Sequence, residues 1–340
     1  MFDFESRIVN VLSAAELAEV ARLIESQGLV YEEGADVTAL VEDVGGHVVA
    51  TAGLFGNVIR AVAVSSEHQE SGLSAVALSN VMEAARVRGL SHLFVYTKSD
   101  MAARFAALGF RNIAETPNVT LLEMGEPSIV QYRKSLAENR ASVSSGMSIA
   151  SVVVNCNPFT RGHRHLMNLA ARENDFLFVV VVEAELSFFT VRDRLEMVRR
   201  GVSDIVNARV IGSGEYAVSA ATFPTYFLKD RGKESVATEQ AGLDIDLFLR
   251  LYVPTLGITA RYVGTETESP VTRIYNETMR KILPPAGVRV IEIDRLRTDS
   301  GDVISASKVR AMLSSGKTDG IGDYVPDSTA DWLIGMGHRL

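Results

Sequence analysis

The residues with the clearest capacity for chemistry lie in the segment NCNPFTRGHRHL, which begins at Asn155 directly after the apolar run IASVVV. We expect a turn at Asn157 and Pro158, and Gly162 allows backbone to come close to a ligand. A helix that begins near Gly162 points its free N–H groups and its positive dipole end at the same place. An imidazole in its first turn, here His163, can donate to phosphate oxygens as negative charge builds at phosphorus. The segment therefore predicts a phosphate-binding site.

The stretch from Thr160 to His163 resembles the HxGH signature of the nucleotidyltransferase superfamily, with threonine in place of the first histidine. A threonine hydroxyl gives one neutral hydrogen bond but cannot carry charge. The imidazole role would therefore fall on His163, with Thr160 as its partner in catalysis. Asn157, Pro158, Phe159 and Gly162 are expected to contact ATP. His165 lies about 200° further around the helix, so we expect it to be peripheral.

A second segment, ISASKVRAML, begins at Ile304 and also has the character of a helix start. Ser305 and Ser307 are natural N-cap residues, and Lys308 and Arg310 fall in the first turn. Cations there oppose the helix dipole, so an anionic ligand would explain them better than helix stability does. The segment resembles the ISSTxxR element of the same superfamily. Together the two motifs predict a triphosphate held between two helix N-termini, with Arg310 and Lys308 steadying the leaving pyrophosphate.

Nearly continuous apolar runs alternate with helical patterns in this half of the chain, which predicts an α/β fold with a Rossmann-like parallel sheet. Ligands of such sheets bind beyond the carboxyl ends of the strands. Gly264, Thr265 and Glu266 follow one of these runs and are expected to contact adenine or ribose. The predicted strands are 149–154, 176–182, 208–212, 260–264 and 288–293, with helices from about 162 and over 191–202.

The composition fits a two-domain globular protein of 340 residues, with 47% apolar and 22% charged residues. A net charge of −8 argues against a nucleic-acid or anionic-membrane binder. Cys156 is the single cysteine, so no internal disulfide forms, and a cytoplasmic protein is expected. No apolar run approaches the ~20 residues that span a bilayer. Because no carboxylate cage is evident, Mg²⁺ is expected to arrive with ATP.

The first half reads as a separate α/β domain over residues 1–140, with the nucleotidyltransferase domain over 148–340. The loop from Gln69 to Ser74 resembles the Q/R-x-x-G-x-G/A loop of GNAT acetyltransferases, which presents backbone N–H groups to the pyrophosphate of coenzyme A. Gln69 and Gly72 are its candidate binding residues. Phe105 lies near the position where that family often has a tyrosine that acts as an acid, and a phenylalanine cannot donate a proton. The resemblance therefore implies a GNAT-like domain that binds a CoA-like arm without acyl transfer.

From residue 148 to about 325 the chain resembles the citrate lyase ligase family, on strings such as SFFTVRDRLEMVRRGVSD, ATFPTYFLKD and PVTRIYN. The resemblance implies a ligase that activates acetate with ATP to acetyl-adenylate and releases pyrophosphate. The acetyl group would then pass to the thiol of a phosphoribosyl-dephospho-CoA arm on the acyl carrier subunit of citrate lyase, releasing AMP.

Three alternatives remain open from the residues. The first is another adenylyltransferase, which makes a dinucleotide or a CoA precursor. The second is a non-catalytic sensor, and the third is an N-acetyltransferase with an ATP-binding regulator. The residues that bind the acid are also open. Candidates to bind the negative charge of the acid are Arg192, Arg194, Lys229 and Arg273. Candidates to line its pocket are Ser213, Tyr216, Ser219 and Thr222.

Overall fold

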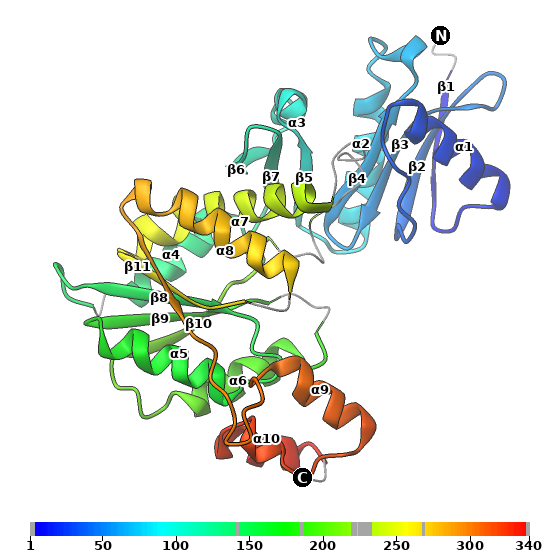
Figure 1. Ribbon diagram of the computed structural model, residues 1–340. Helices are drawn as coiled ribbons and strands as arrows, with labels where there is room; N and C mark the ends of the chain where they lie inside the picture. Colours follow the sequence, from blue (N-terminus) through cyan, green and yellow to red (C-terminus); the bar gives the residue numbers. More distant parts are fainter. Residues whose placement is uncertain are drawn as a thin grey trace. The chain divides into compact units, whose positions relative to one another are not determined.

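The computed structural model describes residues 4–140, 143–183, 187–218, 223, 233–266 and 269–337. Its internal contacts divide the chain into two compact units. The first comprises Met1–Gln131 and Thr222–Asp246, and the second comprises Tyr132–Ala221 and Leu247–Leu340. The units are described one at a time (Figure 1).

The first unit is built on a mixed sheet in the order β1-β2-β3-β4-β5-β7-β6. All its ladders are antiparallel except that between β4 and β5. Helix α2 packs its apolar face, including Ala77 and Val81, on the sheet. The elements are β1 (Phe4–Val9), α1 (Ala14–Ser26), β2 (Val37–Asp43), β3 (Val48–Phe55), β4 (Val58–Val64), α2 (Leu73–Val87), β5 (His92–Lys98), α3 (Ala102–Ala106), β6 (Arg111–Glu115) and β7 (Val119–Gly125).

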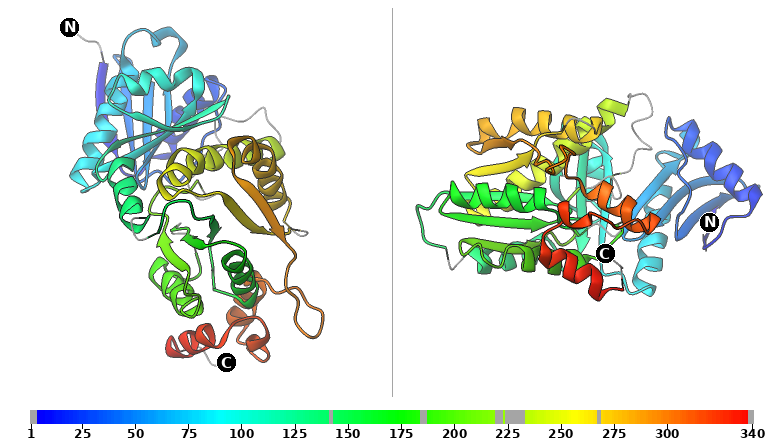
Figure 2. Two further views of the ribbon diagram at one scale, coloured as in Figure 1. Left: turned by 90° about the vertical axis from the view of Figure 1, so that its left-hand side faces the viewer. Right: turned by 60° about the horizontal axis from the view of Figure 1, so that its bottom comes forward.

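The second unit contains a five-stranded sheet in the order β10-β9-β8-β11-β12, with every ladder parallel. Helices α5 and α6 lie on one face of this sheet and α8 lies on the other (Figures 1 and 2). The elements of this unit are β8 (Ile149–Val154), α5 (Arg161–Arg172), β9 (Phe176–Val181), α6 (Val191–Gly201), β10 (Ala208–Gly212), β11 (Ala260–Gly264), α8 (Pro270–Ile282), β12 (Arg289–Ile293), α9 (Ala306–Ser315) and α10 (Asp327–Gly335). Helices α4 (Ile129–Arg140) and α7 (Lys233–Leu256) each contribute residues to both units.

The sequence pattern explains why these strands are central. Residues 177–181 of β9 are all fully buried, as a strand covered by helices on both faces requires. Helix α5 contributes Leu166, Met167 and Ala170 to the same core, on one stripe of its surface. The packing of these helix and strand side chains fixes the position of the strands, whose carboxyl ends lie at the same edge of the sheet.

Strands β8 and β11 separate towards that edge. They pair only at Ala150 with Ala260 and at Ser151 with Arg261, although both strands continue for three more residues. The order of the sheet reverses between these two strands, which is where open parallel sheets bind their ligands. The diverging strand ends leave room for a ligand at that point.

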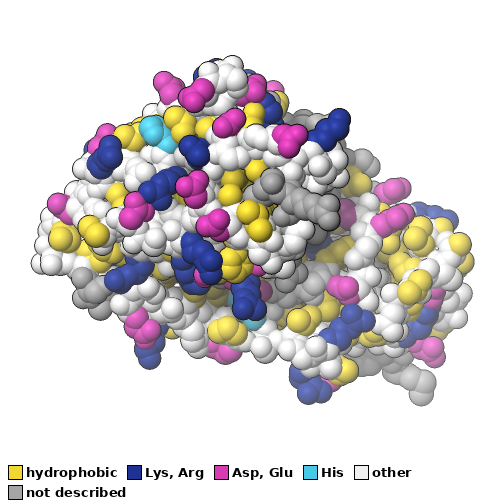
Figure 3. Space-filling view, turned by 90° about the horizontal axis from the view of Figure 1, so that it is seen from below, with side chains coloured by type: hydrophobic (Ala, Val, Ile, Leu, Met, Phe, Trp, Pro, Cys, Tyr) yellow, Lys and Arg dark blue, Asp and Glu magenta, His cyan; other side chains and the backbone are white. Residues whose placement is uncertain are grey.

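The predicted fold class, α/β throughout with a Rossmann-like parallel sheet in the second half, is confirmed. The five predicted strands match β8 to β12 to within one residue at each end. In the described part of the chain, none of the helices is both long and apolar enough to cross a membrane. On the face drawn in Figure 3, Lys and Arg side chains are mixed with Asp and Glu.

Candidate functional site

A cavity of about 400 Å³ opens in the second unit at the carboxyl ends of β8, β11 and β12. This size suits a small-molecule ligand. Its wall includes Val154, Thr160, Gly162, His163, His165, Gly264, Thr272, Tyr275, Arg295, Ile304, Ser305 and Ser307. The two predicted motifs therefore meet at one cavity, together with Gly264 from β11.

Thr160 and His163 form a reciprocal cap at the start of α5. The Thr160 hydroxyl accepts from the peptide N–H of His163 at 3.3 Å, and the peptide N–H of Thr160 donates to Nδ1 of His163 at 3.1 Å. The hydroxyl also lies 2.9 Å from Nδ1. This is the capping-box geometry, with histidine in the place usually held by glutamate or glutamine. Threonine is therefore the residue that orients the imidazole.

The hydrogen bond from Thr160 also fixes the protonation of the His163 ring. A nitrogen that accepts from a peptide N–H carries no proton, so in the neutral ring the proton is on Nε2. Burial, and secondarily the charge of Arg295, lower the pKa of His163 to about 4. At neutral pH the ring is uncharged and presents an N–H donor. Nε2 has no hydrogen-bond partner among the residues that the structure describes.

For two glycines of the wall, nothing in the described part of the protein requires glycine. A Cβ on Gly162 would lie 3.6 Å from the carbonyl oxygen of Ile304 and 3.6 Å from Oγ1 of Thr160, which is ordinary contact. A Cβ on Gly264 would meet no described heavy atom within 4 Å. Neither residue has a backbone conformation restricted to glycine. Their bare backbone therefore suits a ligand that approaches closely.

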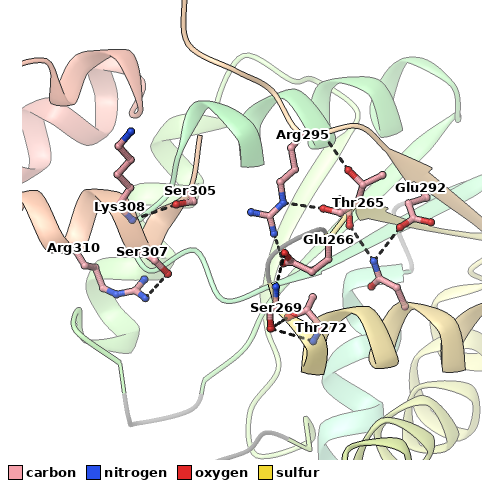
Figure 4. Close-up of polar contacts among 12 residues, drawn as sticks. Thr265, Glu266, Ser269, Thr272, Glu292, Arg295, Ser305, Ser307, Lys308 and Arg310 are labelled. Atoms are coloured by element: carbon pink, nitrogen blue, oxygen red, sulfur yellow. Dashed lines mark hydrogen bonds and ion pairs between the residues drawn. The ribbon is translucent and has the colours of Figure 1, made fainter. Parts of the chain in front are cut away.

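The second motif is the N-terminus of α9. Ser305 is its N-cap, and its hydroxyl accepts from the peptide N–H of Lys308 at 3.2 Å. Arg310 donates from one terminal nitrogen to the carbonyl oxygen of Asn157 at 2.5 Å. Its other terminal nitrogen donates to Oγ of Ser307 at 3.0 Å (Figure 4). Arg310 thus ties the two motifs together from outside the cavity wall, which does not include its side chain.

Lys308 has a different environment from the one predicted. Its ammonium group lies 2.8 Å from a carboxylate oxygen of Asp302 and 5.0 Å from the centre of the Tyr324 ring. It is not part of the cavity wall. The pair with Asp302 raises the pKa of Lys308 and lowers that of Asp302. This ion pair explains a cation at a helix start without any ligand.

The turn before α5 adjoins the site but does not line the cavity. The bond between Asn157 and Pro158 is cis, and Oδ1 of Asn157 accepts from the peptide N–H of Phe189 at 3.0 Å. Phe159 is fully buried and stacks near His163, with ring centres 6.0 Å apart. Cys156 is also buried, and burial raises the pKa of its thiol. None of these side chains belongs to the cavity wall, so they shape the loop rather than line the cavity.

Thr265 and Glu266, expected to contact adenine or ribose, are engaged with Arg295. Nε of Arg295 donates to the carbonyl oxygen of Thr265 at 2.8 Å, and a terminal nitrogen is ion-paired with Glu266 (Figure 4). The Glu266 carboxylate is 5% exposed and also accepts from the peptide N–H of Ser269 at 3.0 Å. Neither Thr265 nor Glu266 is in the cavity wall, whereas Arg295 is.

Sequence reasoning missed Arg295 and did not expect His165 at the cavity. The position of Arg295, directly beyond the last strand, was a usable signal, because that edge is where chemistry is expected. His165, expected to be structural or peripheral, is among the residues that line the cavity. Its direction around α5 did not keep it away, because the cavity extends along the first turns of the helix.

The remaining candidates lie elsewhere. Arg194 is fully buried and donates to the carbonyl oxygens of Asn155 and Val182, so it joins the ends of β8 and β9. Burial lowers the pKa of its guanidinium. The wall of the cavity does not include Arg192, Arg273, Ser213 or Tyr216. Lys229, Ser219 and Thr222 lie outside the described residues.

The predicted arm-binding residues lie in the first unit, before α2. Gly72 is the N-cap of α2, with a φ of 73° that favours glycine, and a Cβ there would meet no described heavy atom within 4 Å. Gln69 donates to the side chain of Gln27 at 3.2 Å. Phe105 is buried beside Phe110 in the core of the first unit. In neither unit do the described residues contain three or more His, Cys, Asp or Glu grouped to hold a metal ion.

The chain is similar to known proteins over nearly its whole length. A profile of the citrate lyase ligase C-terminal domain matches residues 149–333. The [citrate [pro-3S]-lyase] ligase of Escherichia coli is 34% identical over 94% of this chain and 90% of that protein. The one from Haemophilus influenzae is 37% identical over 85% of this chain and 87% of its own.

Among solved structures, an acyl-CoA N-acyltransferase from Pseudomonas aeruginosa matches 36% of this chain and 97% of its own, at 18% identity and a TM-score of 0.31. Escherichia coli ElaA matches 36% of this chain and 99% of its own, at 16% identity and a TM-score of 0.32. The similarity to the curated ligases extends through both halves of the sequence. The chain belongs to the citrate lyase ligase family, and it is a ligase.

Proposed function

We propose that the cavity of the second unit binds ATP and acetate and joins them as acetyl-adenylate. The observation that carries this proposal is that two capped helix N-termini, those of α5 and α9, meet at one cavity. The wall of this cavity includes Gly162 and Gly264, where the described structure would accommodate a Cβ. The positive dipole ends favour a phosphate there, as does the peptide N–H of Gly162, which has no acceptor among the described residues. The residues proposed to contact ATP or to shape its site are Asn157, Pro158, Phe159, Gly162, Gly264, Thr265, Glu266, Ile304, Ser305, Ser307 and Lys308.

In the first step a carboxylate oxygen of acetate attacks the α-phosphorus of ATP. The new P–O bond forms as the bond to the β-phosphate oxygen breaks, and pyrophosphate leaves. His163 donates its Nε2–H to an oxygen of the α-phosphate, where negative charge increases in the transition state. Because the ring is already neutral and held by Thr160, no proton has to move before it can donate. Arg310, at the junction of the two motifs, is proposed to meet the pyrophosphate.

Mg²⁺ is proposed to accompany the nucleotide. The described residues provide no carboxylate cluster of their own for it, and Mg²⁺ commonly keeps waters and binds through substrate phosphates. Bound in this way, it would neutralise charge on the phosphates.

In the second step the sulfur of the carrier's thiol attacks the acetyl carbonyl carbon. The thiol proton is released, and AMP leaves as the thioester forms. The thiol is proposed to belong to the phosphoribosyl-dephospho-CoA arm of the acyl carrier subunit of citrate lyase. The first unit is proposed to bind this arm at the peptide N–H groups that begin α2, after Gly72. The curated relatives are named as ligases of citrate lyase, which supports a carrier of that enzyme as the acceptor.

The test is exchange of radiolabelled pyrophosphate into ATP, measured with a panel of short carboxylates and with nicotinamide mononucleotide and phosphopantetheine as alternative acceptors. The proposal expects exchange that depends on acetate. Exchange that depends only on a phosphate-bearing acceptor would instead support a different adenylyltransferase. A complete lack of exchange with every acceptor would support a non-catalytic sensor.

A further inference from the structure

We propose that Arg295 is a catalytic residue that contacts an oxyanion of the substrates beside His163, and that buried Glu266 is its positioning residue. This inference rests on the proposed function of the cavity. The shared chemistry is a negatively charged oxygen, supplied either by a phosphate of ATP or by the carboxylate of the acid.

The hydrogen bonds of Arg295 leave one part of the guanidinium for a ligand. Nε donates to the carbonyl oxygen of Thr265 at 2.8 Å, and one terminal nitrogen is ion-paired with Glu266. The other terminal nitrogen has no hydrogen-bond partner among the described residues. A guanidinium fixed on two sides is well suited to bind an oxyanion with the third.

The side chain of Glu266 is more deeply buried than that of Arg295. The Glu266 side chain is 5% exposed, whereas the Arg295 side chain is 29% exposed and belongs to the cavity wall. The peptide N–H of Ser269 donates to the second carboxylate oxygen at 3.0 Å, so both oxygens of Glu266 face protein donors. The carboxylate of Glu266 holds the arginine through the contact drawn in Figure 4, and only the arginine of this pair belongs to the cavity wall.

The other cations near the cavity differ from Arg295 in position, exposure or charge. Arg310 donates to Asn157 and Ser307 outside the wall, and Lys308 is paired with Asp302. Arg261 does line the cavity, but it is 2% exposed and lies over the Phe248 ring at 4.3 Å. His163 is neutral at pH 7. Arg295 is therefore the wall cation, among the described residues, with appreciable exposed surface.

The location of Arg295 agrees with this role. It follows β12 at the carboxyl edge of the sheet, and its positive charge is one of the causes that lower the pKa of His163. An arginine near the imidazole and a neutral N–H donor can share the charge of one phosphoryl or carboxylate group. A purely structural ion pair between the loops after β11 and β12 would not require either exposure or proximity to His163.

The test compares Arg295→Met, Arg295→Lys and Glu266→Gln with the control Arg280→Met. Arg280 is also paired with a glutamate of the second unit, Glu292 at 2.5 Å, but it is not in the cavity wall. For each variant, kcat and the KM values for ATP and acetate are measured by pyrophosphate exchange. The Kd for ATP without acetate is measured by calorimetry, and Tm by thermal unfolding.

We expect Arg295→Met to lower kcat/KM by about 10²–10³-fold, the scale of losing one oriented donor to a transition state. Arg295→Lys should recover part of this loss, since it keeps the charge without the fork, and Glu266→Gln should lose about tenfold through poorer positioning. A rise confined to the Kd and KM of ATP identifies a phosphate as the oxyanion. A rise confined to the KM of acetate identifies the carboxylate, and a fall in kcat identifies the transferring group.

The proposal is overturned if kcat/KM of Arg295→Met stays within about threefold of that of Arg280→Met, since the expected loss is about 10²–10³-fold. If Arg295→Met does not fold, Arg295→Lys decides: a folded variant with unchanged kcat/KM overturns the proposal. Failure of the proposed function is separate, because the wild-type protein would then show no acetate-dependent exchange at all.

Discussion

The substitution Gly162→Ala separates a ligand-facing glycine from a structural one. The added Cβ would lie 3.6 Å from the Ile304 carbonyl oxygen and 3.6 Å from Oγ1 of Thr160, so the protein accommodates it without movement. Gly162 is the second residue of α5. Alanine in a helix is favoured over glycine by up to about 1 kcal/mol, less in the first turn, so Tm should stay constant or rise by no more than about 3 °C.

Activity should nevertheless fall. The methyl group would stand at the cavity wall where a phosphate is proposed to meet the helix N-terminus. Moving the phosphate away by about 1 Å weakens its contacts with the N–H groups and with His163, and misplacement of that size costs about 10²-fold in rate. We expect kcat/KM for ATP to fall by about this factor in the acetate-dependent exchange assay, with Tm unchanged.

Two control substitutions make the result interpretable. Gly201→Ala places a Cβ 2.1 Å from the buried Phe159 ring, so it should lower stability by about 1–3 kcal/mol. Gly335→Ala meets no described heavy atom within 4 Å and lies outside the cavity wall, so it should alter neither stability nor activity appreciably. Wild-type kcat/KM in Gly162→Ala would refute the reasoning, because no ligand could then lie against that backbone.

The other predictions concern single roles within the proposed mechanism. His163→Ala should lose at least about 10²-fold in exchange rate. The pKa of His163 in the folded protein, about 4, is below the ordinary 6.5, so the stability that the neutral ring contributes is complete above pH 6.5 and declines as the pH falls towards 4. Unfolding measured as a function of pH, with His163→Gln as the reference, will test this. Thr160→Val should cost about 1 kcal/mol of stability and lower kcat, since it removes the cap of α5, whereas Thr160→Ser should retain both; equal kcat in the two variants would contradict an orienting role. Gly72→Val should reduce acetylation of the carrier and leave acetate-dependent exchange intact, and loss of both activities would argue against a separate arm site.

Much of the second unit could be predicted because its signals are local. The runs IASVVV and FLFVVV are apolar on both sides, so their burial in a parallel sheet follows from composition alone. The helix start at Thr160 follows from a side chain that can accept from the third peptide N–H. The same reasoning located Ser305 at the N-terminus of α9.

The side-chain partners could not be predicted, because they come from distant parts of the chain. Lys308 turns to Asp302, and Arg295 to Glu266, which lies on the loop after a different strand. A helical wheel places His165 on another face than His163 but does not show how far the cavity extends along α5. These facts depend on how the loops after β11 and β12 fold back on the strand ends, and local patterns do not contain that information.

The most direct test of the central claim is a crystal structure of the protein with a non-hydrolysable analogue of acetyl-adenylate. The account predicts the phosphate within hydrogen-bonding distance of His163 Nε2 and of the peptide N–H of Gly162 at the start of α5, with the α9 N-terminus on the opposite side. An analogue bound outside this cavity, or one whose phosphate faces away from both helix N-termini, would contradict it.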